Sequence, residues 1–219
     1  MVETISSSSA NLTVENSSVH NYNKNGIVAR YAGANLIATG NYVQGSGPID
    51  VIAQNGIELA FDGATGSIKN NTVIDNFYTP NTSSSADILL YDAKEYATIA
   101  VSGNTLGNSN YAVSLVTTTP GTYGDGVSVT TNKIFGTSTF DAIDVCTNAN
   151  IITGNTIFNS SESGIHLDAS WDGHRQHCER EHHSGKRVCW NPYRCWHRQS
   201  RDQHLLHGAV SSRHFHFIV

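Results

Sequence analysis

The chain has 219 residues, of which only 14% are charged and 38% are hydrophobic. Gly, Asn, Ser and Thr fill most of the remainder, and this composition favours short strands and turns over helices. No run of about 18 apolar residues occurs, so we expect no transmembrane helix. Residues 1–10 also lack the basic start and the apolar core of a signal peptide.

Charge and rare residue types divide the chain near Ser170. Up to that residue there are five Lys or Arg against fourteen Asp or Glu, a net charge of −9, whereas the remainder carries a net charge of +4. All three Trp, three of four Cys and nine of eleven His also follow Ser170. We therefore expect three parts: a partial coil or disordered start at 1–11, one repetitive domain at 12–170, and an atypical, poorly ordered tail at 171–219.

A two-part motif recurs six times between Leu12 and Ala169. In chain order, its first part reads VENSSV (14–19), GNYV (40–43), IKNNTV (68–73), VSGNTL (101–106), VTTNKI (129–134) and IITGNTI (151–157). Its second part reads GIVA (26–29), GIEL (56–59), DILL (87–90), AVSL (112–115), AIDV (142–145) and GIHL (164–167). Constant strand-like units joined by loops of variable length are typical of a solenoid.

Alignment of the six copies gives one polar column and one apolar column. The polar column contains Ser17, Asn41, Asn71, Asn104, Asn132 and Asn155, and the apolar column contains Ile27, Ile57, Ile88, Val113, Ile143 and Ile165. Alternation turns every second side chain inward, where it packs on its equivalent one coil away. The asparagines are predicted to form a hydrogen-bonded ladder at a sharp corner. The pattern predicts an all-β, right-handed, single-stranded parallel β-helix of about six coils.

These G-N-T-[IV] and [GA]-I-x-L units resemble the repeats of the right-handed parallel β-helix family, the pectin-lyase-like superfold. The resemblance covers about Leu12 to Ala169. The resemblance strongly indicates the fold but says little about the function, because one fold hosts many functions. It also implies that an enzyme of this kind would carry acids, bases and sometimes Ca²⁺ on an exterior strand face.

Two groups of polar residues are candidates for chemistry. Asp144 and His166 are predicted to lie one coil apart on an exterior face, with Asp168 on the same face and Asp141 at the start of the same strand. A carboxylate beside an imidazole can perform acid–base catalysis. The alternative is a solvated surface pair. The second group, Asp87, Asp92, Lys94 and Glu95, could hold Ca²⁺ or form an ordinary polar turn. Apart from this Ca²⁺ we expect no cofactor and no metal.

The tail after Ser170 has three interpretations: a zinc site, a basic nucleic-acid-binding arm, and translation in the wrong reading frame. Its Cys and His suit zinc, but their spacing does not. Sliding the codons forward by one base forces Gly at Trp190 and at Trp196. With permitted codons, residues 175–199 then read VSTVSGNTIAGNACAGILTGAGTGN. This string restores the motif in register, with its Asn at position 181 and its Ile at position 191, so we favour the frameshift.

The leading functional hypothesis is a secreted or cell-surface binding or structural module that contacts polysaccharide. The alternative is a fragment of a glycan lyase, hydrolase or epimerase, with no activity expected from this chain as it stands. The net charge of −9 argues against nucleic acid as a partner. The sequence carries no indication of oligomeric state.

Overall fold

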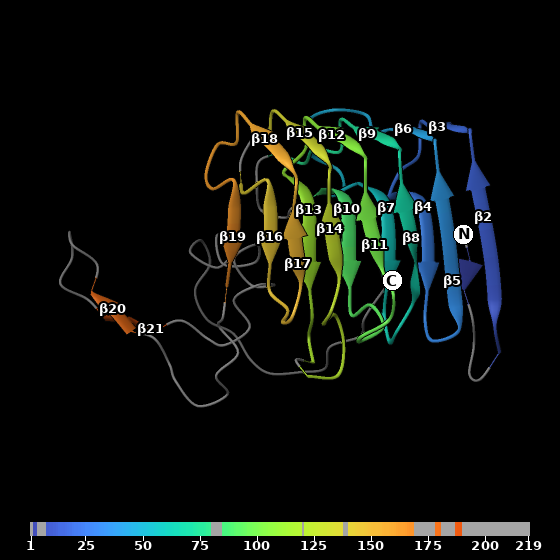
Figure 1. Cartoon of the computed structure of the whole chain (residues 1–219). Coiled ribbons are helices and arrows are strands. Elements are labelled where there is room, and N and C mark those ends of the chain that lie inside the picture. The colour runs from blue at the N-terminus through green and yellow to red at the C-terminus, as the bar shows by residue number, and fades with distance from the viewer. Residues whose placement is uncertain are drawn as a thin grey trace, which may run out of the picture.

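A computed structural model describes residues 8–79, 85–119, 121–137 and 140–168, together with the backbone of residues 2–3, 178–180 and 187–189. Every regular element in these ranges is a β-strand. Accordingly, none of the described residues belongs to a helix long and apolar enough to cross a membrane. Three parallel sheets run the length of the body and share one interior (Figure 1).

The three sheets are named here by letters, and their strands are given in spatial order. Sheet A consists of β1 (Val2–Glu3), β4 (Asn25–Arg30), β7 (Asn55–Ala60), β10 (Ala86–Tyr91), β13 (Tyr111–Val116), β16 (Ile143–Val145) and β19 (Ile165–Leu167). Sheet B consists of β17 (Ile151–Thr153), β14 (Ser128–Thr130), β11 (Ala100–Ser102), β8 (Thr65–Lys69), β5 (Ala34–Thr39) and β2 (Ala10–Glu15). Sheet C consists of β18 (Thr156–Phe158), β15 (Lys133–Phe135), β12 (Thr105–Gly107), β9 (Thr72–Ile74), β6 (Tyr42–Gln44) and β3 (Ser18–His20).

From β2 onward the chain visits sheets B, C and A in turn, and each strand pairs in parallel with the strand one turn away. The result is a parallel β-solenoid of about five turns, which confirms the predicted all-β class and stacked architecture. The predicted right-handed sense stays a prediction. Beyond the body, β20 (Cys178–Arg180) and β21 (Arg187–Cys189) pair in antiparallel fashion. Predictions about side chains and order in the tail fall outside the described residues.

The apolar columns form the core. The predicted column of Ile27, Ile57, Ile88, Val113, Ile143 and Ile165 is in register across sheet A. Its members from Ile57 to Ile143 are fully buried, as are Leu106 and Ile134 on sheet C. Each such side chain packs on its equivalents above and below, so burial of one turn depends on the next.

The asparagine column forms the corner between sheets B and C. The side-chain Oδ1 of Asn104 accepts hydrogen bonds from the backbone N–H and the Nδ2 of Asn71, at 2.9 and 3.0 Å. The Nδ2 of Asn104 donates to the carbonyl of Ile68 and to Oδ1 of Asn132. The same links join Asn41 to Asn71 and Asn132 to Asn155. The corner needs a positive φ just before each asparagine, which Gly103 supplies at 66°.

Candidate functional site

The outward column of sheet A carries the residues that we considered for catalysis. Strand pairing aligns Val28, Glu58, Leu89, Ser114, Asp144 and His166 along the solenoid. Most of this column is buried, however: Glu58 is 3% exposed and Asp144 is 6% exposed. Strand alternation fixed the direction of these side chains, but it could not show what covers them. Asp144 therefore does not lie on an open exterior face.

His166 lies between two carboxylates at the last turn. Its Nδ1 is 3.0 Å from Oδ2 of Asp141 and 3.5 Å from Oδ1 of Asp144. Asp144 is the direct neighbour of His166 across β16 and β19, whereas Asp141 lies just before β16. The backbone N–H of Ser163 donates to Oδ1 of Asp141 at 2.8 Å, which turns the other carboxylate oxygen toward the imidazole. Sequence spacing thus brought Asp144 and His166 together, but the closer partner is Asp141.

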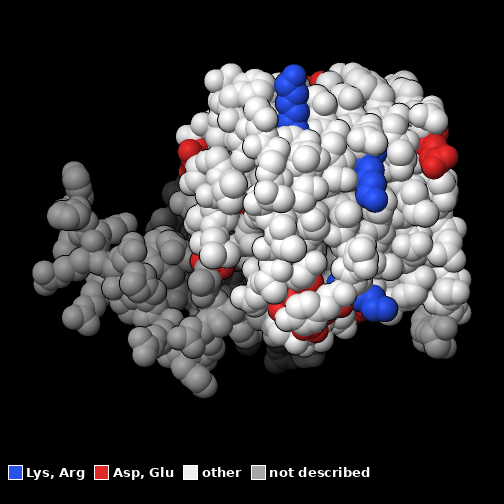
Figure 2. Space-filling model, viewed as in Figure 1, with Lys and Arg blue, Asp and Glu red and all other residues white. Residues whose placement is uncertain are grey.

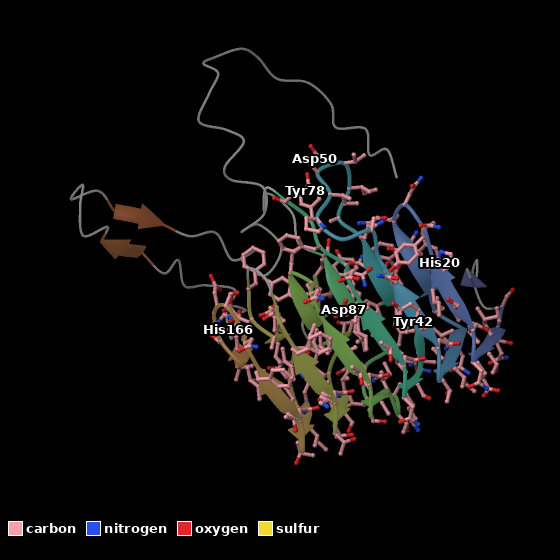
Figure 3. The ribbon with its side chains drawn as sticks, turned by 90° about the horizontal axis from the view of Figure 1, so that it is seen from above. His20, Tyr42, Asp50, Tyr78, Asp87 and His166 are labelled. Atoms are coloured by element: carbon pink, nitrogen blue, oxygen red, sulfur yellow. The ribbon has the colours of Figure 1, made fainter. Side chains whose placement is uncertain are left out.

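The exposure of the three side chains differs. The two Asp side chains are 4% and 9% exposed, whereas the His166 side chain is 40% exposed. Figure 3 shows His166 at the end of the body farthest from His20. The backbone N–H of Asp168, the third candidate, donates to the carbonyl oxygen of Val145 at 2.9 Å. Asp168 does not belong to the group formed by Asp141, Asp144 and His166. The arrangement is a solvent-accessible imidazole oriented by a buried carboxylate, which suits proton transfer or metal binding.

Comparison with family models, curated proteins and solved structures finds no match for this chain. The site must therefore be judged from its own geometry.

Asp141, Asp144 and His166 form the group of potential metal ligands found among the described residues, with ligand atoms that all lie within 4.8 Å of one another. The four residues considered for Ca²⁺ do not converge in this way. Asp92 accepts hydrogen bonds from Thr117 Oγ1 and from both the backbone N–H and Oγ1 of Thr118, at 2.7–2.8 Å. Lys94 is exposed and Glu95 is half-buried in the segment that follows. These residues serve as turn and hydrogen-bonding groups here.

Asp87, the remaining Ca²⁺ candidate, is fully buried (Figure 3). It stands where the other copies of the motif have Gly or Ala. Its carboxylate accepts hydrogen bonds from Nδ2 of Asn76 at 3.0 Å and from the backbone N–H of Gly107 at 2.7 Å. Burial raises the pKa of Asp87 well above its usual range, although the hydrogen bonds from Asn76, Ser109 and Gly107 oppose that increase. The sequence shows the break in the column but not the partners, which come from other turns.

The aromatic side chains mostly pack on one another or on polar partners. Phe61 lies between Tyr31 and Tyr91, with ring centroids 5.9 and 5.1 Å away, and the Arg30 guanidinium lies 5.3 Å from its centroid. Burial raises the pKa of Tyr91 to about 12, with the charge of Asp92 adding to the increase. Tyr42 on sheet C keeps 39% of its surface exposed. Of the aromatic residues on the strands, Tyr42 is well placed to meet a ligand.

Sheets B and C present a second candidate surface beside the asparagine corner. Hydroxyl side chains occupy most register positions there, Ser102, Thr130 and Thr153 on sheet B and Thr72, Thr105 and Thr156 on sheet C, with Lys69 beside Ser102 and Lys133 between Thr105 and Thr156. The face seen in Figure 2 carries few Asp, Glu, Lys or Arg side chains. We call these two columns and Tyr42 the hydroxyl face. It offers neutral donors and acceptors at most turns, together with the Lys69 and Lys133 side chains.

Proposed function

We propose that this chain is a secreted or cell-surface β-solenoid of the pectin-lyase-like superfold that binds a neutral polysaccharide as a binding or structural module. The observation that carries the proposal is the hydroxyl face. Hydroxyl groups both donate and accept hydrogen bonds, as the hydroxyls of a sugar require. A polymer lying along the solenoid would meet a hydroxyl group at most turns, which are about 4.8 Å apart, so that weak contacts add up.

Charge argues for a neutral rather than an acidic glycan. The chain up to Ser170 has a net charge of −9, which repels polyanions unless a cation bridges the two. Within the hydroxyl face, Lys69 and Lys133 are charged neighbours of the hydroxyls, and the view in Figure 2 shows few other charged side chains. Exposed Tyr42 adds an aromatic surface on which the apolar face of a sugar ring can stack.

A pull-down with insoluble cellulose, xylan and mannan, alongside soluble pectate, tests this function. We expect retention on at least one neutral polymer and none on pectate without Ca²⁺. The double variant Ser102→Glu/Thr130→Glu should lose retention, because two carboxylates would interrupt the face. The double variant Val51→Glu/Ile52→Glu, at positions that are 85% and 36% exposed, is the charge-matched control and should bind normally. Equal retention of all three proteins, with unchanged circular dichroism, would reject the proposal.

The second candidate function is a glycan-acting enzyme, favoured by the placement of His166 between Asp141 and Asp144. Nδ1 paired with a carboxylate leaves Nε2 to take or give a proton. We expect no turnover of pectate or alginate by this chain, because its sequence carries no recognisable catalytic motif of the glycan-acting β-helix enzymes. Release of reducing ends or unsaturated uronates that disappears in His166→Ala would establish the enzymatic function instead.

We also propose that the tail is the product of a shifted reading frame. The support is the register of the restored string: its GNTI asparagine falls 26 residues after Asn155, within the 23–33 residue spacing of the ladder. Its isoleucine falls ten residues later, the interval that separates Asn155 from Ile165. The last described turn also has the apolar surface that a further coil would cover, since Ile165 is 52% exposed and Leu167 is 68% exposed. Sequencing the gene across the codons for Ser170 to Gly173 tests this interpretation.

A further inference from the structure

Three metal-ligating side chains from two adjacent turns converge at the end of sheet A. Asp141 and Asp144 come from the turn that contains β16, and His166 comes from β19. Their ligand atoms all lie within 4.8 Å of one another, and the two Asp residues are 3% and 6% exposed. Two nearly buried carboxylates held this close favour a cation beside them.

A proton on His166 meets that need only in part. Nδ1 carries at most one proton, and Asp141 at 3.0 Å is the nearer of its two carboxylate partners. Asp144, at 3.5 Å from the same nitrogen, lies beyond a good hydrogen bond. A divalent cation would balance both carboxylates at once.

The two separations from Nδ1 also match the ligand shell of a small divalent ion. Ligand atoms at about 2.0–2.2 Å from Zn²⁺ lie about 2.9–3.5 Å apart when they meet at octahedral or tetrahedral angles. The observed separations of Nδ1 from the two carboxylate oxygens, 3.0 and 3.5 Å, fall in this range. Ca²⁺ fits less well, because it takes about six to eight oxygen ligands. Imidazole together with carboxylate selects a first-row transition metal.

We propose that Asp141, Asp144 and His166 bind a divalent transition-metal ion, with Zn²⁺ as the test ion. Nδ1 is the ligating atom of His166, so that the proton resides on Nε2. The hydrogen bond from the Ser163 N–H to Oδ1 of Asp141 fixes the second carboxylate oxygen toward the ion, the role that outer-shell partners play in metal sites. Three protein ligands leave a position open on the side where His166 is exposed. The metal site is independent of the hydroxyl face.

The test is a calorimetric titration of the full chain with Zn²⁺ after chelator treatment. Because nine of the eleven His and three of the four Cys follow Ser170, the informative quantity is the difference between variants rather than the total binding. Wild type should bind one equivalent more than His166→Ala and one more than the near-isosteric Asp141→Asn. The controls are His20→Ala, at an exposed position of the body, and the tail double variant His182→Ala/His183→Ala. Both controls should keep that equivalent.

Thermal unfolding supplies a second readout that does not depend on counting sites. Zn²⁺ should raise the unfolding temperature of the wild type and of the His20→Ala protein more than that of Asp141→Asn, since only an ion bound to the folded site stabilises it. Equal stoichiometry and equal thermal shifts in wild type, Asp141→Asn and His166→Ala would overturn the proposal. Loss of the equivalent in the tail variant alone would also overturn it and would assign the binding to the tail.

Discussion

Leu115 and Leu167 occupy the same inward column of sheet A, and the strand carrying Val145 separates them. Leu115 is 1% exposed, whereas Leu167 is 68% exposed. The same contrast separates Ile134 from Ile157 on sheet C, where the first is fully buried and the second only half-buried. One residue type in one register thus has two environments, because each turn is buried by its successor. The stability of a solenoid comes from contacts between turns more than from any turn alone.

The largest expected difference concerns these two leucines. Leu115→Ala should lower the free energy of unfolding by about 2–5 kcal/mol, because it opens a cavity between packed turns. Leu167→Ala should cost about 0.5 kcal/mol or less, since that side chain already contacts solvent. Urea unfolding followed by circular dichroism measures both. Equal costs would contradict the idea that the last turn is incompletely buried.

The asparagine ladder should show the same gradient. Asn104→Ala should cost about 1–3 kcal/mol, because it leaves buried partners without hydrogen bonds on both sides. Asn155→Ala should cost less, since Asn155 is only half-buried and water can replace its side chain. Asn11→Ala, at an exposed strand position, is the control and should be nearly neutral. A cost for Asn155→Ala as large as that for Asn104→Ala would refute the gradient.

Two glycines extend the comparison to overpacking. A Cβ at Gly56 would overlap Cγ1 of Val73 and lie 2.6 Å from the carbonyl oxygen of Asp87. At Gly164, in the same column, the nearest atom would be Cγ2 of Ile157 at 3.8 Å. Gly56→Ala should therefore destabilise by about 1–3 kcal/mol, whereas Gly164→Ala should be tolerated. Thermal unfolding of the two variants checks this prediction. Equal unfolding temperatures for the two variants would show that the interior turns have room for the added Cβ.

The smallest expected effect is a pH dependence caused by Asp87. Burial raises its pKa in the folded protein above the value of about 4 expected in the unfolded chain. The folded state then binds the proton more tightly, so this group lowers stability as pH rises from about 4 toward the folded-state pKa. Asp87→Ala, which installs the residue present in two other turns, should gain stability relative to wild type over that window. A difference between the urea midpoints of wild type and Asp87→Ala that stays constant from pH 4 to 8 would contradict the assignment.

The sequence predicted those features that repeat. The two columns, through Ile57 and through Asn104, fixed the fold class, the stacking and the register, because each copy of the motif repeats the same local rule. It also placed Asp144 beside His166. It did not predict Asp141 as the closer partner or the burial of Asp87, since these depend on loops and on contacts made once. A repeated motif can be recognised in a single sequence, whereas a contact that occurs only once in the molecule is seen only in the three-dimensional structure.

The gradient between the interior turns and the last described turn is the one expected if, as we propose, the tail replaces a coil that the shifted frame encodes. The test uses a restored protein, in which residues 175–199 are replaced by VSTVSGNTIAGNACAGILTGAGTGN. The control is a scrambled protein that carries the same residues at these positions in a different order. Matching composition removes any effect of charge or hydrophobicity alone.

Hydrogen exchange at the β19 amides, measured together with the urea midpoint, is the most direct measurement. The restored coil should protect the amides of Ile165 and Leu167 and raise the midpoint above those of wild type and the scrambled protein, because it supplies the next turn of the apolar columns and of the asparagine ladder. Equal protection and equal midpoints in the restored and scrambled proteins would contradict the account.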